Sequence, residues 1–270
     1  MILGGLLCLG AFLGCAPGDT ITEDLAAGVV YHKIHLLEGP WWIHVVEIDL
    51  PTAWAAGVRL RTAMAMSERG GVQKTSSLAA GALAAINGDF LYTGKTTHTA
   101  GLQIHEGRLI RTPQRRSAFA ISAAGAPLIA VYQLEMGVLT SRGEELRASG
   151  FNREPDRGEL VVFNHYARAW RDSVRAARGF LLRGLEGNSI VNGAVTARVQ
   201  QVRRRAWPLV LDPGQWLLAA GPDYAAAAGI APGDTVRLYG RLPPARDALV
   251  EAIGGGPRIL RDGAISVEVE

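Results

Sequence analysis

The chain has 270 residues, of which 48% are apolar and 20% are charged, and its formal net charge is +3 at pH 7. This composition predicts a folded chain with a sizeable core, organised as one domain or two small ones, and it excludes an intrinsically disordered protein. The one tight basic run, Arg203-Arg204-Arg205, is more typical of a solvated loop or strand edge than of a nucleic-acid interface, so we expect no nucleic-acid partner.

The N-terminal segment differs in composition from the rest of the chain. Residues 1–14 carry no charged side chain and are rich in Leu and Gly, which predicts a signal peptide over residues 1–15 and export to the bacterial envelope, the periplasm or the medium. The segment is too short to span a bilayer, which takes about 20 apolar residues. Cys15 follows Phe12-Leu13-Gly14 and resembles a lipobox cysteine, the alternative being an ordinary cysteine of the signal region. Membrane contact is therefore expected only through a lipid anchor at Cys15.

The body of the protein, residues 16–270, contains no cysteine, because Cys8 and Cys15 both lie in the leader. A disulfide, a thiol nucleophile and a zinc–thiolate site are thus excluded there. Residues 29–37 and 45–50 are rich in β-branched and aromatic residues and predict paired strands. Thr75-Ser76-Ser77 predicts a helix N-cap followed by a short helix that ends near Gly81. The apolar run 83–87 predicts a buried strand.

Hairpin patterns follow. Residues 101–110 predict a tight hairpin around Glu106-Gly107, and residues 118–122 and 128–132 predict another pair of strands. Further strands are expected at 159–163, 215–219, 235–239 and 259–260, and one helix at 223–228. Together these elements predict a single α+β domain, made of β-rich mixed sheets with a few short helices, and not a βαβ array.

Two distant segments each place glycine directly after an apolar, strand-like approach. They are residues 85–90, which include Asn87, Gly88 and Asp89, and residues 252–257, which include three consecutive glycines. Glycine adopts positive φ and lets a ligand approach the main chain, while Asn87 and Asp89 add an amide and a carboxylate. We expect the two segments to form one site for a polar ligand.

Four segments, taken in their order along the chain, resemble the phosphodiester glycosidase family: residues 81–90, 101–109, 116–121 and 251–263. The vertebrate member of that family removes N-acetylglucosamine from a phosphodiester. The resemblance implies hydrolysis of the bond between an anomeric carbon and a phosphate oxygen, in a cell-envelope or exopolysaccharide glycan. A carbohydrate or sugar phosphate is the partner that it implies.

Such chemistry usually employs paired carboxylates, although a phosphate leaving group needs little protonation. Asp89 is the first candidate for a catalytic or positioning carboxylate, and the alternative is a turn aspartate that bonds its own backbone. Many relatives have glycine at that position. Asn87 matches the family pattern and could donate to a sugar hydroxyl or a phosphate oxygen, or simply close the turn. Glu251 is the second candidate carboxylate, the alternative being a solvated glutamate on a strand.

Arg116 could bind two phosphate oxygens with its guanidinium, or could instead form a salt bridge at a sheet edge. His98 lies where the family has a variable loop on the substrate side, and a surface histidine is the alternative. His105 is expected to face solvent. The full set of expected substrate-binding residues is Gly88, Phe90, His98, Gly101, Arg116, Gly254, Gly255 and Gly256.

No cofactor is expected. The histidines have no spacing that predicts a metal site, although Asp and Asn oxygens leave a divalent cation open. The turn at 254–257 lacks the Gly-Lys-Ser/Thr ending of a P-loop, which excludes nucleotide binding. Usual family members continue into an Asn-Leu-Asp-Gly-Gly-Gly-Ser loop that this sequence lacks, which implies a C-terminally truncated domain over 16–270. A non-catalytic envelope lipoprotein that binds glycans or phosphoglycans, and an inactive fragment, are the alternatives.

Overall fold

The computed structural model describes residues 17–39, 41–65, 72–92, 98–170, 176, 178–204 and 210–268. The expected signal peptide and Cys15 lie outside these residues. The chain divides into two compact units, Met1–Arg59 with Gly81–Ala84 and Leu60–Ala80 with Ala85–Glu270. The single-domain boundary at 16–270 stays a prediction. Within the described residues, no helix has both the length and the apolar character that crossing a bilayer requires.

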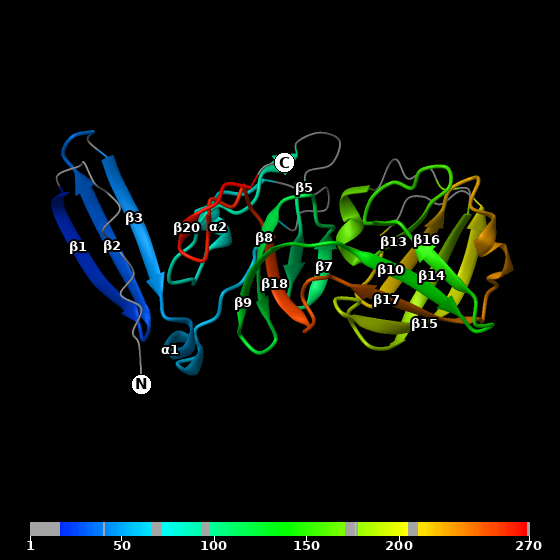
Figure 1. The fold of residues 1–270 in the computed structure, drawn as a ribbon. Coiled ribbons are helices and arrows are strands. Elements are labelled where there is room, and N and C mark those ends of the chain that lie inside the picture. Colours follow the sequence, from blue (N-terminus) through cyan, green and yellow to red (C-terminus); the bar gives the residue numbers. More distant parts are fainter. Residues whose placement is uncertain are drawn as a thin grey trace. The chain divides into compact units, whose positions relative to one another are not determined.

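The first unit is a three-stranded antiparallel sheet followed by a short helix (Figure 1). Its strands are β1 (Pro17–Ala26), β2 (Val29–Leu36) and β3 (Trp41–Ile48), and α1 spans Leu50–Ala55. The expected strand at 29–37 is present, whereas β1 was not expected. Leu50 begins α1 instead of ending a strand, since Pro51 in the first turn favours a helix start.

The second unit contains a five-stranded antiparallel sheet in the order β7-β6-β18-β8-β9. Both expected hairpins form here, and the Glu106-Gly107 turn has φ of 48° and 74°, as a two-residue type I′ turn requires. Strand β18, far along the chain, lies between the two hairpins and pairs with β6 and β8. The strands are β6 (Gln103–His105), β7 (Arg108–Arg111), β8 (Ser117–Ser122), β9 (Pro127–Val131) and β18 (Leu249–Gly254).

An eight-stranded sheet completes the second unit, in the order β11-β10-β17-β15-β14-β16-β13-β12. Its pairs are antiparallel except for β12 with β13, so the sheet is mixed. One apolar cluster joins residues of both sheets, for example Ile104 and Ala120 with Val138 and Leu238. The strands are β10 (Glu135–Thr140), β11 (Glu145–Ala148), β12 (Gly150–Phe151), β13 (Leu160–Phe163), β14 (Arg178–Glu186), β15 (Gly193–Arg204), β16 (Gln215–Ala220) and β17 (Thr235–Arg241).

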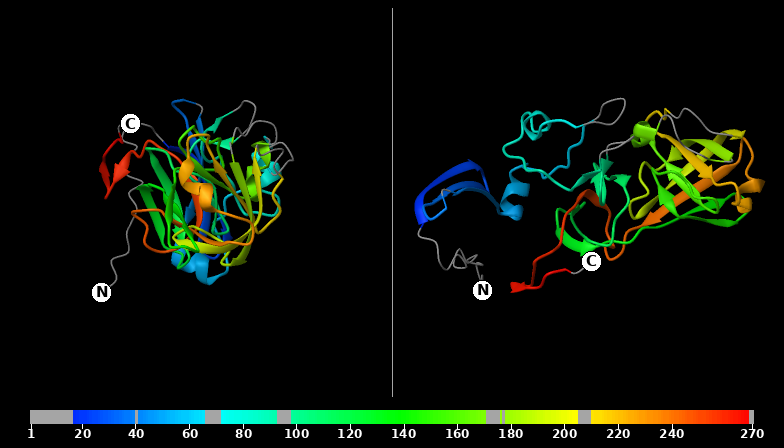
Figure 2. Two further views of the ribbon diagram at one scale, coloured as in Figure 1. Left: turned by 90° about the vertical axis from the view of Figure 1, so that its right-hand side faces the viewer. Right: turned by 90° about the horizontal axis from the view of Figure 1, so that it is seen from above.

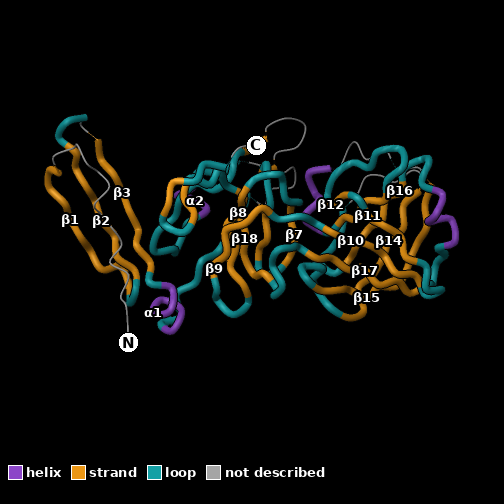
Figure 3. The backbone as a smooth tube through the Cα atoms, viewed as in Figure 1, coloured by secondary structure: helices purple, strands orange, loops and turns teal. Residues whose placement is uncertain are grey.

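The remaining elements are short, and the structure is β-rich with few helices (Figures 2 and 3). The helices that the structure describes form no layer against a sheet, so the α+β label describes the chain only roughly. These elements are α2 (Thr75–Leu78), η2 (His165–Trp170) and η3 (Ala225–Gly229), which are helical, and the strands β4 (Leu91–Tyr92), β5 (His98–Thr99), β19 (Leu260–Arg261) and β20 (Ala264–Ile265).

Three local predictions were wrong. Residues 83–87 form no strand, and Leu83 and Ile86 are 51% and 87% exposed, since no described strand pairs with this segment. Lys74, not Thr75, is the N-cap of α2, since the Thr75 hydroxyl donates to Asn87 instead. The helix expected at 223–228 is a single 3₁₀ segment, η3.

Candidate functional site

The structure brings parts of the two glycine-containing segments into contact. A Cβ atom placed on Gly254, the last residue of β18, would overlap the Asp89 carboxylate, lying 2.8 Å from its Cγ, and would lie 3.2 Å from Cα of Gly101. A Cβ on Gly88 would lie 3.0 Å from Cγ1 of Ile253. The segment at 88–89, the loop at Gly101 and the end of β18 therefore pack directly together, with glycine required at the closest approach.

Asp89 is the centre of this cluster. Its Oδ1 accepts a hydrogen bond from the Phe90 amide at 2.7 Å and another from Nη2 of Arg116, and its Oδ2 accepts one from the Gly101 amide. The side chain is fully buried. Because protein donors occupy both oxygens, this carboxylate is suited to hold Arg116 and the Gly101 loop in place more than to exchange protons.

Arg116 precedes β8 and is the cation of the cluster. Its side chain is 12% exposed, and its guanidinium carbon lies 5.4 Å from the centroid of the Phe90 ring. Its Nε is buried without a hydrogen-bond partner in the described part of the chain. A guanidinium has five N–H donors, and Asp89 is the one acceptor that the described residues supply, so donors remain for an anion. Phe90 is 69% exposed beside it.

The other glycines of the turn have different roles. Gly256 has φ of +110°, and a Cβ placed on it would lie 3.6 Å from Cβ of Arg116. Gly255 has open space around it, but its amide donates to the Ser117 carbonyl at 3.2 Å. Glu268, which sequence reasoning missed, accepts hydrogen bonds from the Ser117 amide and hydroxyl at 3.0 Å and 3.1 Å. The turn is thus tied to the start of β8.

Asn87 is exposed and lies two residues before Asp89. Its Oδ1 accepts a hydrogen bond from the Thr75 hydroxyl, which leaves both amide hydrogens without a partner among the described residues. No described contact joins Asn87 to the three glycines. Asn87 is therefore close to the cluster because it lies two residues before Asp89 in the chain, and its role in binding or catalysis stays a prediction.

Glu251 belongs to a separate network. Its carboxylate accepts hydrogen bonds from the amide and hydroxyl of Thr62, at 2.9 Å and 2.8 Å, and from the Glu106 amide at 3.1 Å, and it lies 3.6 Å from Nδ1 of His105. No described hydrogen bond or ion pair links it to Asp89 or Arg116. The two candidate carboxylates are therefore not paired, and Thr62, which sequence reasoning missed, is 8% exposed and part of the Glu251 network.

His105 does not face solvent as expected, because Glu251 holds it and its side chain is 27% exposed. The nearby Glu251 carboxylate raises the pKa of His105, and burial opposes that change only in part. Burial acts to raise the pKa of Glu251, but the hydrogen bonds from His105, Thr62 and Glu106 outweigh it and the pKa is lowered. The pair joins β6 to its neighbour β18.

His98 pairs through its backbone with Tyr92, between β5 and β4, and its side chain lies outside the part that the structure describes. The described residues hold no group of three or more His, Cys, Asp or Glu that could bind a metal ion.

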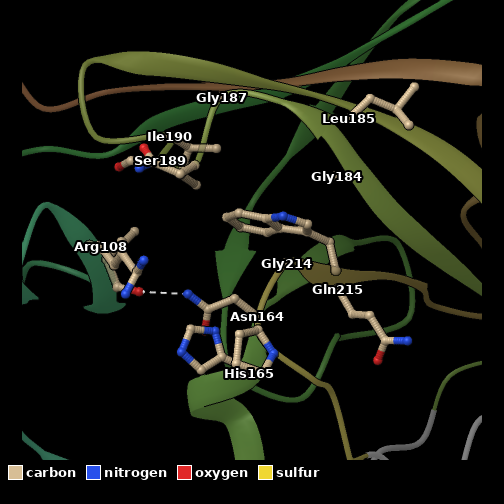
Figure 4. A pocket seen from close by; sticks show the side chains of 14 residues that line it. Arg108, Asn164, His165, Gly184, Leu185, Gly187, Ser189, Ile190, Gly214 and Gln215 are labelled. Atoms are coloured by element: carbon tan, nitrogen blue, oxygen red, sulfur yellow. Dashed lines mark hydrogen bonds between the residues drawn. The ribbon is translucent and has the colours of Figure 1, made fainter.

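A cavity of about 180 Å³ lies elsewhere in the second unit, among β7, β14, β16 and the start of η2 (Figure 4). Arg108, Asn164, His165, Gln215 and Trp216 are among its lining residues. None of the expected site residues lines it. Sequence reasoning missed this cavity because its walls come from four segments between residues 108 and 216. The signal in the sequence was Trp216, a large aromatic residue inside an expected strand.

Comparisons with protein-family models and with curated proteins give no match. Two solved structures share the fold. A hypothetical protein from Synechocystis has a TM-score of 0.66 at 17% identity, over 93% of this chain and 46% of that one. A "Putative exported protein" from Burkholderia pseudomallei K96243 has a TM-score of 0.59 at 16% identity, over 91% of this chain and 73% of that one. The chain thus spans about half the length of the first of these structures.

Proposed function

We propose that this protein is an exported phosphodiester glycosidase, which hydrolyses the anomeric C–O bond of a sugar 1-phosphodiester in an envelope or exopolysaccharide glycan. The observation that carries the proposal is the Arg116 guanidinium, held by buried Asp89 where the 88–90, Gly101 and Gly254 segments meet, with a buried Nε that has no partner in the described residues. Glycine-lined backbone beside a guanidinium suits a phosphate.

Each part of the cluster has a role in this proposal. Arg116 binds two oxygens of the phosphodiester and stabilises the charge that develops on the departing phosphate. The exposed ring of Phe90, next to Arg116, offers an apolar face for the sugar. Asn87 has free amide hydrogens for a sugar hydroxyl. Asp89 is a positioning residue, because protein donors occupy its oxygens.

Export rests on the composition of residues 1–15, and a similar solved structure bears the description of a putative exported protein. A lipid at Cys15 would retain the protein at the envelope. Mass spectrometry of the membrane fraction of producing cells would detect the acylated peptide, and its absence would remove the anchor from the proposal.

A second candidate function is non-catalytic binding of a phosphoglycan. It is favoured by one observation, that Asp89 and Glu251 are both occupied by protein donors and lie in separate networks. In the described residues the cluster at Arg116 then has no free carboxylate to act as an acid or a base. Binding by Arg116 and Phe90 would not need one.

The test compares turnover and binding in the purified full chain. UDP-GlcNAc and a sugar 1-phosphodiester are supplied, and free sugar is measured alongside binding by calorimetry. We expect Arg116→Gln to lower turnover by about 10² to 10³, the cost of removing one donor to a developing anion. The matched control is Arg237→Gln, an exposed arginine of β17 that is distant in sequence from the cluster residues and should leave turnover unchanged.

Each outcome decides between the candidates. Release of free sugar that Arg116→Gln abolishes supports the glycosidase. Saturable binding without release, lost in the same variant, selects the binding module. If neither substrate binds or reacts, or if Arg116→Gln and Arg237→Gln behave alike, the proposal is wrong.

A further inference from the structure

We infer that the cavity among β7, β14, β16 and η2 is a binding site for one acidic monosaccharide unit, a sugar ring that bears a carboxylate. This site is separate from the Arg116 cluster and goes beyond the proposed function, since none of its lining residues belongs to that cluster. Three features of its walls carry the inference: an indole, an unpaired cation, and an excess of hydrogen-bond donors.

The indole is that of Trp216 on β16. It lines the cavity, and its Nε1 lies 3.8 Å from the position that a Cβ on Gly184 would take. Trp216 is 6% exposed, and Gly184 and Gly214, which also line the cavity, have no side chains to cover the part of the ring that faces it. No residue in the described part of the chain accepts a hydrogen bond from Nε1. An indole with a free N–H offers a sugar both an apolar surface for its C–H face and a donor for a hydroxyl.

The cation is Arg108, from β7. Its guanidinium forms no ion pair or hydrogen bond with the residues that the structure describes, and no lining residue is acidic. Figure 4 shows Arg108 on one side of the cavity, near Ser189 and Ile190, and Gln215 on the opposite side. An unpaired guanidinium at the wall of a small cavity selects a ligand with a negative charge, and its planar fork matches a carboxylate or a phosphate.

Hydrogen bonds within the protein fix the side-chain amides of Asn164 and Gln215 and leave N–H donors available to a ligand. Asn164 donates to the Leu109 carbonyl at 2.9 Å and accepts from Asn152 at 2.9 Å, so its orientation is set. Gln215 accepts from the Asp212 amide at 2.9 Å through Oε1, which leaves Nε2 with two free hydrogens among the described contacts. The available groups are therefore mostly donors, and a ligand rich in oxygen acceptors satisfies them.

The size of the cavity sets the size of the ligand. A volume of about 180 Å³ is below the range of about 300 to 1,000 Å³ of sites for drug-sized molecules, so one sugar ring fits and an oligosaccharide does not. A planar carboxylate also needs less of this space than a tetrahedral phosphate. The combination of one ring, one carboxylate and several hydroxyls describes a uronic acid.

The test titrates the full chain with three probes, glucuronate, glucose and acetate, using calorimetry and saturation-transfer NMR. A ligand of this size is expected to bind with a Kd on the order of 1 mM. Glucuronate should bind at least about tenfold more tightly than glucose or acetate, because only glucuronate supplies both the ring and the charge. Arg108→Gln should weaken glucuronate binding about tenfold or more and leave glucose unaffected.

Controls separate binding from folding. Arg198→Gln removes an exposed arginine of β15 that does not line the cavity, and it should bind glucuronate as the parent does. Gln215→Ala, a half-buried position, is the second test variant and should also weaken glucuronate binding. The inference is overturned if glucuronate shows no saturable binding up to about 10 mM, or if Arg108→Gln and Arg198→Gln bind it equally. Because the readout is binding, this result is independent of turnover at the Arg116 cluster.

Discussion

Gly254→Ala is the sharpest test of how the Arg116 cluster is built. The new methyl group would overlap the Asp89 carboxylate and lie 3.2 Å from the Gly101 backbone. Neither neighbour can yield easily: Asp89 is fully buried and held by the Phe90 and Gly101 amides and by Arg116. The methyl group must therefore either strain the backbone or displace the carboxylate from its donors.

The magnitude follows from these two options. Overpacking a tight site costs about 1 to 3 kcal/mol, and parting a buried ion pair costs about 3 to 5 kcal/mol. We therefore expect Gly254→Ala to lower the free energy of unfolding by about 2 to 4 kcal/mol. With a urea m-value of about 2 kcal/mol/M, the midpoint falls by about 1 to 2 M in unfolding followed by far-UV circular dichroism.

The neighbouring glycine provides a matched control. A Cβ on Gly255 meets nothing within 4 Å and its φ is not positive, so Gly255→Ala should change stability by less than about 0.5 kcal/mol. In an Asp89→Ala background, Gly254→Ala should cost about 1 kcal/mol or less, because the main obstacle is gone. Equal effects of the two glycine variants, or strict additivity with Asp89→Ala, would refute this account of the packing.

Two further predictions concern pH. The His105–Glu251 pair should stabilise the folded protein most between about pH 4.5 and 6.5. The raised pKa of His105 gives a stabilisation that is complete below pH 6.5 and is lost as the pH rises. The lowered pKa of Glu251 gives a stabilisation that is present above pH 4.5 and is lost as the pH falls. His105→Gln should remove the alkaline loss from the thermal midpoint, and an unchanged pH profile would contradict the pairing. The hydrogen bonds from Arg153, at 2.6 Å and 2.7 Å, lower the pKa of Glu159 to about 2, so this pair loses its stabilisation as pH falls from 4.5 towards 2. Glu159→Gln should reduce that acid loss by about 1 kcal/mol at most, since both groups contact water, and NMR titration of the Glu159 carboxyl checks the pKa directly.

Local signals in the sequence predicted local structure well. The Glu106-Gly107 and Asp262-Gly263 pairs adopt the positive φ values that two-residue turns need, and the strands on either side pair as the turns require. Strand β15 was missed although Val195, Ala197 and Val199 alternate with polar residues, because alanine and arginine weaken a pattern that is read by residue type. The apolar run at 83–87 was misread for the opposite reason: it has the composition of a strand, but no strand in the described part of the chain pairs with it.

What the sequence determined by itself was part of the turns and half-buried strands, since turn chemistry and alternation act between residues a few positions apart. It also singled out Gly101 and Gly254 as candidate substrate-binding residues, and the structure shows that they allow close packing. Only the tertiary structure decided what the charged groups do, because their partners lie far along the chain: Asp89 meets Arg116, 27 residues away, and Glu251 on β18 meets Thr62, 189 residues away. The environment of a side chain, and hence its chemistry, depends on segments that local patterns do not connect.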